Sequence, residues 1–372
     1  MATALSTELL ARARERAPGY DATNSFFSED LDELRAAGYL APRSLSAASA
    51  DQRLLAAHAP ATALGLTMHL VWMGVARDLA AAGDTSLQWV LDDASAGELF
   101  AFAISEAGND RVMSDSLTRV EKVDDGWAFT GTKIFTTLSP AWTRLGVLGR
   151  HDPADGSAPS IVHGFLLRDA AGIDITPDWN TLGMRATQSH TTHLEGAVVT
   201  DDRVVRILPV GPTAEPYTLS IAASFHTLIA SVYAGIADRA LELAVESAHR
   251  RTSLRAGGAP QAHDADIRWR LADAALALDA LAPQLQAVAR DRDAGVDRGM
   301  RWFRDLAGLK HRSVETARHV VDQAMRIAGG GAYRATAELS RLQRDVLAGI
   351  YHPSDTEAVH ATVAADLLGP LP

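Results

Sequence analysis

The sequence predicts an α+β fold that is mainly α, with a β-domain set between two helical regions. Apolar residues recur at helical spacing before residue 97 and again after residue 217. Between these regions, short segments with the character of strands are separated by Gly, Pro and Asp turns. At 372 residues the chain exceeds what one core normally holds, so we expect an N-terminal helical domain (1–97), a central β-domain (98–210) and a C-terminal four-helix bundle (211–372).

The N-terminal helices are predicted at 26–37, 47–57, 61–82 and 85–94. In the first of them Phe27, Leu31 and Leu34 lie at helical spacing, and Gly38 provides the stop. The segment 54–76 is nearly uncharged and long enough to raise the question of a membrane span. Its histidines, its proline and its many small residues instead favour a helix that is buried on all sides inside a bundle.

The central strands are predicted at 117–123, 126–137, 145–149, 164–168, 173–175 and 191–199. The second strand is the most informative, because a period of two collects its aromatic residues on one face. That face carries Trp127, Phe129, Gly131, Phe135 and Thr137. Aromatic rings beside a glycine gap and a hydroxyl suit a flat heteroaromatic ligand. The alternative is an ordinary core face of a β-sandwich, which shows the same pattern.

After residue 217 the pattern returns to long helices, predicted at 220–251, 261–293, 300–328 and 335–350. Pro283 is expected to bend the second of these helices, and the glycines at 329–331 end the third. Four such helices form a bundle. Their apolar stripes look wide for one chain, so we expect a partner chain to pack a second bundle against them.

Composition excludes several classes of function. The formal net charge of −11, with no basic stripe to offset it, argues against nucleic acid as a partner. A sequence without cysteine cannot form disulfides or use a thiolate nucleophile, and it suits a cytoplasmic protein. The first 18 residues lack the apolar core of an export signal, and we expect no membrane partner. His190 and His193 fall on opposite faces of a strand, so no metal site is expected.

Two segments around the second strand resemble the acyl-CoA dehydrogenase superfamily. They are Phe102-Ala103-Ile104-Ser105-Glu106 and Gly131-Thr132-Lys133-Ile134-Phe135-Thr136-Thr137, which match the family segments that line the flavin ring. Further matches follow in the family's order at Gly183–Thr187, Gly329–Tyr333, Arg341 and Arg344-Asp345. The resemblance implies a flavoprotein fold over most of the chain. It also implies cofactor contacts from Ile104, Ser105, Phe135, Thr136 and Thr137.

The resemblance further implies FAD, with its adenylate half bound by Arg251 and by the segment that contains Arg326, Gly329 and Gly330. The sequence departs from the family at both places. Leu254 stands where the family has an aromatic residue, and Arg326 stands where it has a glutamine. These departures leave FMN or a reduced flavin as alternatives. Independently of the family resemblance, an arginine near a helix C-terminus, such as Arg251, has two alternative roles. It either stabilises the helix through the helix dipole or binds a phosphate group.

The catalytic residues also depart from the family. Where an acyl-CoA dehydrogenase carries a glutamate base near its C-terminus, this sequence has His352. The family's second base position falls near Leu228, beside His226, and neither position holds a carboxylate. A histidine can act as a base at neutral pH, so His352 and His226 are the candidate catalytic residues. The alternative for His352 is a structural residue that precedes Pro353 at the start of a helix.

The resemblance implies hydride transfer from an acyl-CoA or acyl-thioester-like substrate to flavin N5. The segment Leu342–Val346 followed by His352 resembles instead the family's monooxygenase-like type 2 branch, which uses reduced flavin and dioxygen. A non-catalytic family member is the third hypothesis. The resemblance also implies a small-molecule substrate and a homotetramer in which a neighbour's Gly329-Gly330 segment lies near the cofactor. A flavin reductase or an electron acceptor protein is the further partner it implies.

Overall fold

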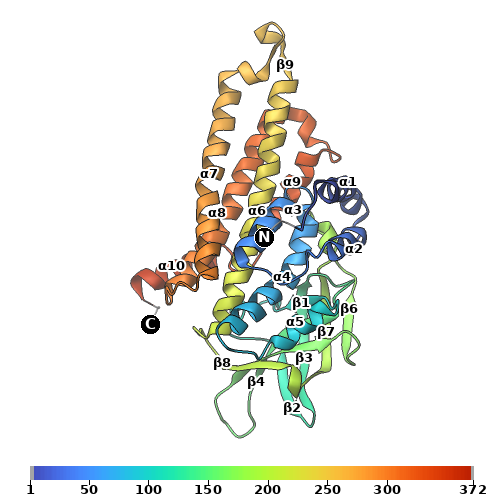
Figure 1. Cartoon of the computed structure of the whole chain (residues 1–372), viewed down its shortest axis with the longest axis vertical. Helices are drawn as coiled ribbons and strands as arrows, with labels where there is room; N and C mark the ends of the chain where they lie inside the picture. The colour runs from blue at the N-terminus through green and yellow to red at the C-terminus, as the bar shows by residue number, and fades with distance from the viewer. Residues whose placement is uncertain (1–3, 370–372) are drawn as a thin grey trace.

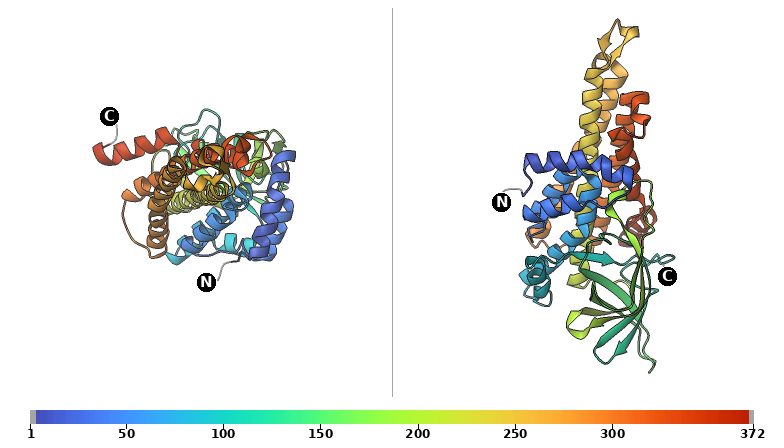
Figure 2. Two further views of the ribbon diagram at one scale, coloured as in Figure 1. Left: turned by 90° about the horizontal axis from the view of Figure 1, so that it is seen from above. Right: turned by 90° about the vertical axis from the view of Figure 1, so that its right-hand side faces the viewer.

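The computed structural model describes residues 4–369 and is elongated, with long helices at one end and a sheet at the other (Figure 1). The N-terminal helices are α1 (Thr7–Thr23), α2 (Ser28–Ala36), α3 (Leu45–Ala56), α4 (Pro60–Ala81) and α5 (Gln88–Ser95). They lie beside the middle of the molecule, where the long helices meet the sheet (Figure 2).

Helix α4 forms the core of the N-terminal part. Pro60 occupies its first turn, where the missing N–H has no partner to lose, and 16 of its 22 residues are buried. The predicted burial is therefore confirmed for α4, whereas Leu54, in the preceding helix α3, is 37% exposed. The ring of Trp72 packs edge-on against Phe102 and Phe165, with centroids 4.6 Å apart in both pairs. A side chain at Gly146 would overlap the Trp72 ring, so this glycine gives the helix room to approach the sheet.

The sheet strands are β1 (Phe100–Ala103), β2 (Arg119–Val123), β3 (Gly126–Thr136), β4 (Arg144–His151), β5 (Ser160–Leu167), β6 (Ile173–Thr176), β7 (His190–Thr200) and β8 (Val204–Pro209). They form one eight-stranded sheet in the order β6-β7-β3-β2-β4-β5-β8, with β1 parallel to β4. β2 and β3 form a hairpin through Asp124 and Asp125, as predicted. β8 is not predicted from the sequence; it is a short strand at the edge of the sheet, where it pairs with β5.

The prediction that β3 collects its aromatic residues on one face is wrong. Two irregularities interrupt its pairing with β7, one after Phe129 and one after Lys133. Phe129 is fully buried, whereas Phe135 is 51% exposed and has a left-handed backbone with φ of 57°. Bulges change the direction in which side chains point. Here they turn Phe135 outward while the earlier part of the strand packs into the core.

The C-terminal helices are α6 (Pro216–Arg250), α7 (Ala265–Asp293), α8 (Arg301–Ala328), α9 (Glu338–Val346) and α10 (Thr356–Leu368). Helix α6 is central and contacts α3, α4, α7 and α8. It is long and apolar enough to cross a membrane, but 83% of its most apolar window is buried inside the protein, as expected for the core helix of a bundle.

Pro283 lies inside α7, and the bend expected there stays a prediction. Other details of this region differ from the sequence prediction. The predicted helix 335–350 is shorter, because a 3₁₀ turn at Leu347–Ile350 replaces its last part. Helix α10 is not predicted, and neither is the small hairpin of β9 (Thr252–Ser253) and β10 (Ala259–Pro260) that joins α6 to α7.

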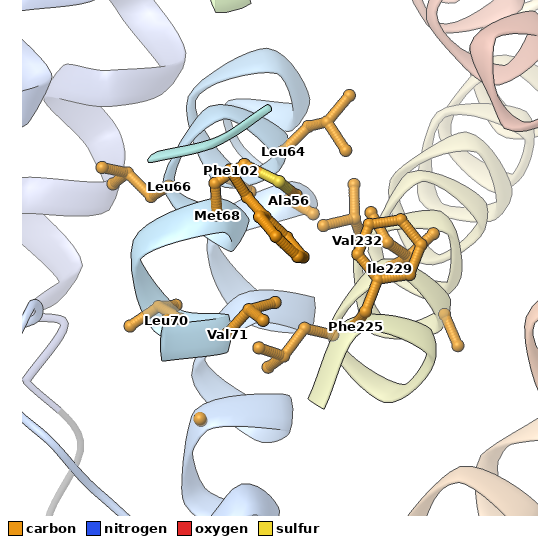
Figure 3. Close-up of a cluster of buried hydrophobic side chains, with 14 of the residues drawn as sticks. Ala56, Leu64, Leu66, Met68, Leu70, Val71, Phe102, Phe225, Ile229 and Val232 are labelled. Carbon is orange, nitrogen blue, oxygen red and sulfur yellow. The ribbon is translucent and has the colours of Figure 1, made fainter. Parts of the chain in front are cut away.

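One hydrophobic core runs through all three regions. Figure 3 shows Phe102 of β1 inserted between α4 and α6, among Met68, Phe225 and Ile229. This junction fixes the end of β1 relative to α6. The strands of the main sheet lie between residues 100 and 209, and the predicted domain bounds themselves stay a prediction.

The β6–β7 loop (residues 177–189) joins the sheet to a C-terminal helix. Met184 N donates a hydrogen bond to Asp345 Oδ1 of α9 at 2.6 Å. Gly183 lies so close to α9 that a Cβ atom there would be 2.2 Å from the carbonyl oxygen of Arg344. The loop and the helix therefore pack backbone against backbone, which only glycine permits.

Gly183→Ala is expected to destabilise the fold by about 1–3 kcal/mol, because the new methyl group would push the β6–β7 loop away from α9. Urea unfolding measures the change. Gly19→Ala in α1 is the matched control, since no described atom lies within 4 Å of its Cβ position and alanine favours a helix. A Gly183→Ala protein as stable as Gly19→Ala would contradict this packing.

Candidate functional site

The predicted ring-binding face lies where the end of β1 meets the irregular part of β3. The residue before Phe135 donates its N–H to Ser105 O at 2.9 Å, which ties the two segments together. Phe135 is half-exposed, and Ser105 and Thr137 are half-buried. The side chains of Ile104 and Thr136 are buried. The structure therefore brings these five predicted residues together, and three of them reach the surface.

Phe135 provides the exposed ring of this face. Its left-handed backbone is a conformation that costs a non-glycine residue about 1–3 kcal/mol and that clusters at functional sites. Trp179 of the β6–β7 loop stands edge-on to it, with ring centroids 6.0 Å apart and an angle of 87° between the planes. A flat heteroaromatic ring requires such an open aromatic surface, so these residues fit a flavin.

Three hydroxyl groups lead from this face into the protein, and we call them the hydroxyl chain. Thr137 Oγ1 lies 2.8 Å from Ser189 Oγ, and Ser189 Oγ lies 2.8 Å from Thr187 Oγ1. Thr187 Oγ1 then donates to Met184 O at 2.9 Å. Ser189 and Thr187 are buried, so the chain reaches the surface at Thr137. Of these three residues, only Thr137 is predicted from the sequence as a cofactor contact, because its partners come from a distant loop.

The hydroxyl chain ends on a backbone segment that Asp345 holds. Met184, which receives the last hydrogen bond, has a left-handed backbone with φ of 51°, and its N–H binds Asp345. Asp345 is 2% exposed, and burial raises the pKa of its carboxyl to about 6 although the charge of Arg341 opposes this. Arg344 donates to a carbonyl of the same loop at 2.9 Å and pairs with Asp21 of α1. The Arg344-Asp345 motif therefore fixes the β6–β7 loop.

A buried ion pair lies next to the ring-binding face. Lys133 Nζ is 2.7 Å from Glu106 Oε1, and the two side chains are 0% and 1% exposed. Glu106 also accepts from the hydroxyls of Ser116 and Thr118, and Lys133 donates to Leu148 O at 2.7 Å. Burial alone would raise the pKa of Glu106, but Lys133 and these hydrogen bonds lower it to about 2. Burial lowers the pKa of Lys133 to about 8.

Both residues lie within the sequence motifs quoted above, but no role is predicted for them there. The available signal was a lysine inside an otherwise uncharged strand and a glutamate that follows a short apolar run. Because Glu106 is adjacent to Ser105, and Lys133 lies two residues before Phe135, the pair holds two parts of the ring-binding face at a fixed separation.

Lys133→Met is expected to cost about 3–5 kcal/mol of stability, because it leaves the Glu106 carboxylate buried without its partner. Glu106→Gln is expected to be destabilising for the converse reason. The double variant should cost clearly less than the sum of the two single changes, with a coupling of at least about 1 kcal/mol in denaturant unfolding. Additive effects would show that the two charges do not stabilise each other.

The structure brings both candidate catalytic residues to one place. His226 Nδ1 lies 2.7 Å from Ala222 O and must carry its proton, which leaves Nε2 as the acceptor for Ser354 Oγ at 3.2 Å. His352 Nε2 lies 2.8 Å from the hydroxyl of Tyr233. Both histidines therefore lie where α6 meets the connection between α9 and α10.

Lys310 of α8 holds that connection. Its ammonium donates to the carbonyl oxygens of Gly349, His352 and Ser354 at 3.0, 2.9 and 2.8 Å. Burial lowers the pKa of Lys310 to about 8. Burial also lowers the pKa of His226 to about 4 and that of His352 to about 3, so both imidazoles are neutral at pH 7. Lys310 is not predicted as a site residue from the sequence, although its position on the apolar face of a helix was an available signal.

The predicted adenylate-binding residues lie at the other end of the long helices, near β9 in Figure 1. Arg251 donates to Ile327 O at 2.6 Å, while Arg326 and Gly330 are exposed and Gly329 ends α8. About 24 residues of α6, rising about 36 Å, separate this end from the candidate catalytic histidines. One chain therefore does not bring these residues to the ring-binding face.

Comparisons with known proteins identify the family. The model described as "Acyl-CoA dehydrogenase, C-terminal domain" matches residues 227–354. The chain is 28% identical to the putative acyl-CoA dehydrogenase YdbM of Bacillus subtilis over 93% of this chain and 91% of that protein. The chain is therefore similar to acyl-CoA dehydrogenases over most of its length, and residues 227–354 match the family's C-terminal domain. The resemblance found in the sequence motifs, and the fold it implied, are confirmed.

The chain also matches proteins whose names describe other reactions. L-evernosamine nitrososynthase of Micromonospora sp. is 32% identical over 60% of this chain and 53% of that protein. A structure of KijD3 with FMN and a dTDP-amino sugar has a TM-score of 0.85 at 22% identity, covering 98% of this chain and 92% of the other. The dibenzothiophene monooxygenase TdsC of Paenibacillus sp., with FMN and indole, has a TM-score of 0.84 at 19% identity, covering 98% and 97%. At these identities the structural matches show the fold alone.

Proposed function

We propose that this protein is a flavin-dependent monooxygenase that takes reduced FMN from a separate reductase and inserts one oxygen atom of dioxygen into a small molecule. The reduced flavin supplies the two electrons, and the second oxygen atom leaves as water. One observation carries the proposal. His352, a neutral and weakly basic histidine, stands where an acyl-CoA dehydrogenase carries its glutamate base, and the equally neutral His226 lies beside Leu228, near the family's second base position.

Both histidines are poor bases for removing a proton from carbon. An efficient general base has a pKa near the working pH, whereas the pKa of His226 is lowered to about 4 and that of His352 to about 3. In addition, Nε2 of each ring is already in a hydrogen bond, with Ser354 in the case of His226 and with Tyr233 in the case of His352. Neutral imidazoles in this setting suit hydrogen bonding to an uncharged substrate.

At the sheet, Phe135 and Trp179 would hold the flavin ring, and Ser105 and Thr137 would orient it through hydrogen bonds. The bound flavin supplies the redox chemistry, while the protein supplies position and excludes water. The ion pair of Glu106 and Lys133 keeps this face rigid, so the ring would meet a preformed surface.

The residues at the β9 end of the long helices favour FMN over FAD as the cofactor. Arg251 already binds Ile327 O, and Arg326 replaces the family glutamine. The KijD3 and TdsC structures, both described with FMN, agree with this choice. Because one chain keeps Gly329 and Gly330 far from the ring-binding face, we also propose a homotetramer in which a neighbour supplies that segment. A cytoplasmic location, where a reductase would be available, belongs to the same proposal.

A dehydrogenase is the second candidate, and one observation favours it. The similarity to the putative acyl-CoA dehydrogenase YdbM extends over 93% of the chain, further than the match to the nitrososynthase. In that case the substrate would be an acyl-CoA thioester, and His352 or His226 would have to act as the base.

Stopped-flow absorbance separates the two candidates. We expect reduced FMN mixed with dioxygen to return to its oxidised spectrum more slowly with the protein than without it, because the ring-binding face shields the flavin from water. His352→Ala should raise the rate of hydrogen peroxide release. The exposed His249, in the last turn of α6, provides the control variant His249→Ala, which should behave as the wild type. Anaerobic bleaching of the flavin by butyryl-CoA would instead establish the dehydrogenase.

Between about pH 5.5 and 8.5, we expect no change in kcat/KM that arises from protonation of His226 or His352. An unperturbed histidine titrates near 6.5, but the lowered pKa values of His226 and His352 keep both rings neutral throughout this range. A pH profile of kcat/KM checks this. A limb near pH 6.5 that disappears in His352→Gln would contradict the account of the site.

A further inference from the structure

The hydroxyl chain has one consistent arrangement of its protons. A carbonyl oxygen accepts and never donates, so the 2.9 Å contact with Met184 O uses the single proton of Thr187 Oγ1. Ser189 must then donate to Thr187, and Thr137 must donate to Ser189. The reverse order would leave the lone pairs of two oxygen atoms facing each other at 2.9 Å.

The backbone that sets this direction is itself fixed. The N–H of Met184 is bound to Asp345, and its carbonyl also accepts from the indole N–H of Trp179 at 3.3 Å. Ser189 is 5% exposed and Thr187 is 1% exposed, so bulk water does not offer these hydroxyls another partner. The order of protons therefore follows from the fold of the β6–β7 loop.

We propose that the hydroxyl chain makes Thr137 an acceptor-only group toward the flavin and thereby selects reduced over oxidised flavin. The inference rests on the proposed function, because it requires a flavin at the face of Phe135. The proton of Thr137 points to Ser189, so only the lone pairs of its oxygen remain for a ligand.

The proposal places N5 of the flavin ring within hydrogen-bond distance of the Thr137 oxygen. N5 of oxidised flavin carries no hydrogen and only accepts, whereas N5 of reduced flavin carries a hydrogen and donates. In that pose, an acceptor-only hydroxyl pairs with the reduced form and places a lone pair against the oxidised one. Ser189 and Thr187 are then specificity-determining residues that act through Thr137, and they suit an enzyme that receives its flavin already reduced.

Anaerobic titration with oxidised and with dithionite-reduced FMN tests the inference by measuring both dissociation constants. We expect wild-type protein to bind reduced FMN about tenfold more tightly, the size of one matched hydrogen bond. This ratio equals a rise of about 30 mV in the two-electron potential of the bound flavin.

Two variants should remove the preference by different routes. Ser189→Ala deletes the acceptor of Thr137, whose hydroxyl can then donate to oxidised flavin. Thr187→Val deletes the acceptor of Ser189, which can then donate to Thr137 and turn its proton outward. In both variants the ratio of the two dissociation constants is expected to fall about five- to tenfold, toward one.

Thr192→Val on β7 is the matched control. It removes a fully buried hydroxyl that has no hydrogen-bond partner among the described residues, and it should leave the ratio unchanged. A wild-type ratio of one or below, or an unchanged ratio in both Ser189→Ala and Thr187→Val, would overturn the inference and leave FMN binding, and so the proposed function, intact. Binding of neither redox state would overturn both.

Discussion

The hydrogen bond from Met184 N to the buried carboxylate of Asp345 is the contact on which the site depends. It joins α9 to the β6–β7 loop, and that loop places Trp179 beside Phe135 and supplies the hydroxyls that bind Thr137. Burial raises the pKa of Asp345 to about 6, so keeping the carboxylate ionised at neutral pH costs stability. We interpret that cost as the price of a fixed loop geometry, because a single buried acceptor holds a left-handed backbone in place.

The charged groups around the site are neutralised or engaged by protein partners. Lys133 is paired with Glu106, and Lys310 is surrounded by backbone carbonyls. His226 and His352 are neutral because burial lowers their pKa values. The protein therefore offers a ligand hydrogen-bonding groups without formal charge, with a rigid aromatic face on the sheet and neutral imidazoles on the helices. This arrangement supports oxygen transfer to an uncharged molecule better than removal of a proton from carbon.

Local patterns in the sequence were sufficient to locate most of the longer helices and strands. Helical periodicity located α4 and α6, and period-two alternation with a turn located the β2–β3 hairpin. The same period failed at Phe135, because the bulges depend on pairing with β7, which is distant in sequence. The pairing of Glu106 with Lys133, and the contact of Asp345 with Met184, were also beyond local patterns, since each joins residues brought together only by the fold. The family resemblance, rather than periodicity, brought His352 into consideration.

A crystal structure of the protein soaked with FMN tests the central claim most directly. The account predicts the isoalloxazine ring against Phe135, with Trp179 at its edge and the hydroxyl of Thr137 within hydrogen-bond distance of the ring. A ring bound elsewhere, or a Phe135 face covered by side chains of another subunit, would contradict it.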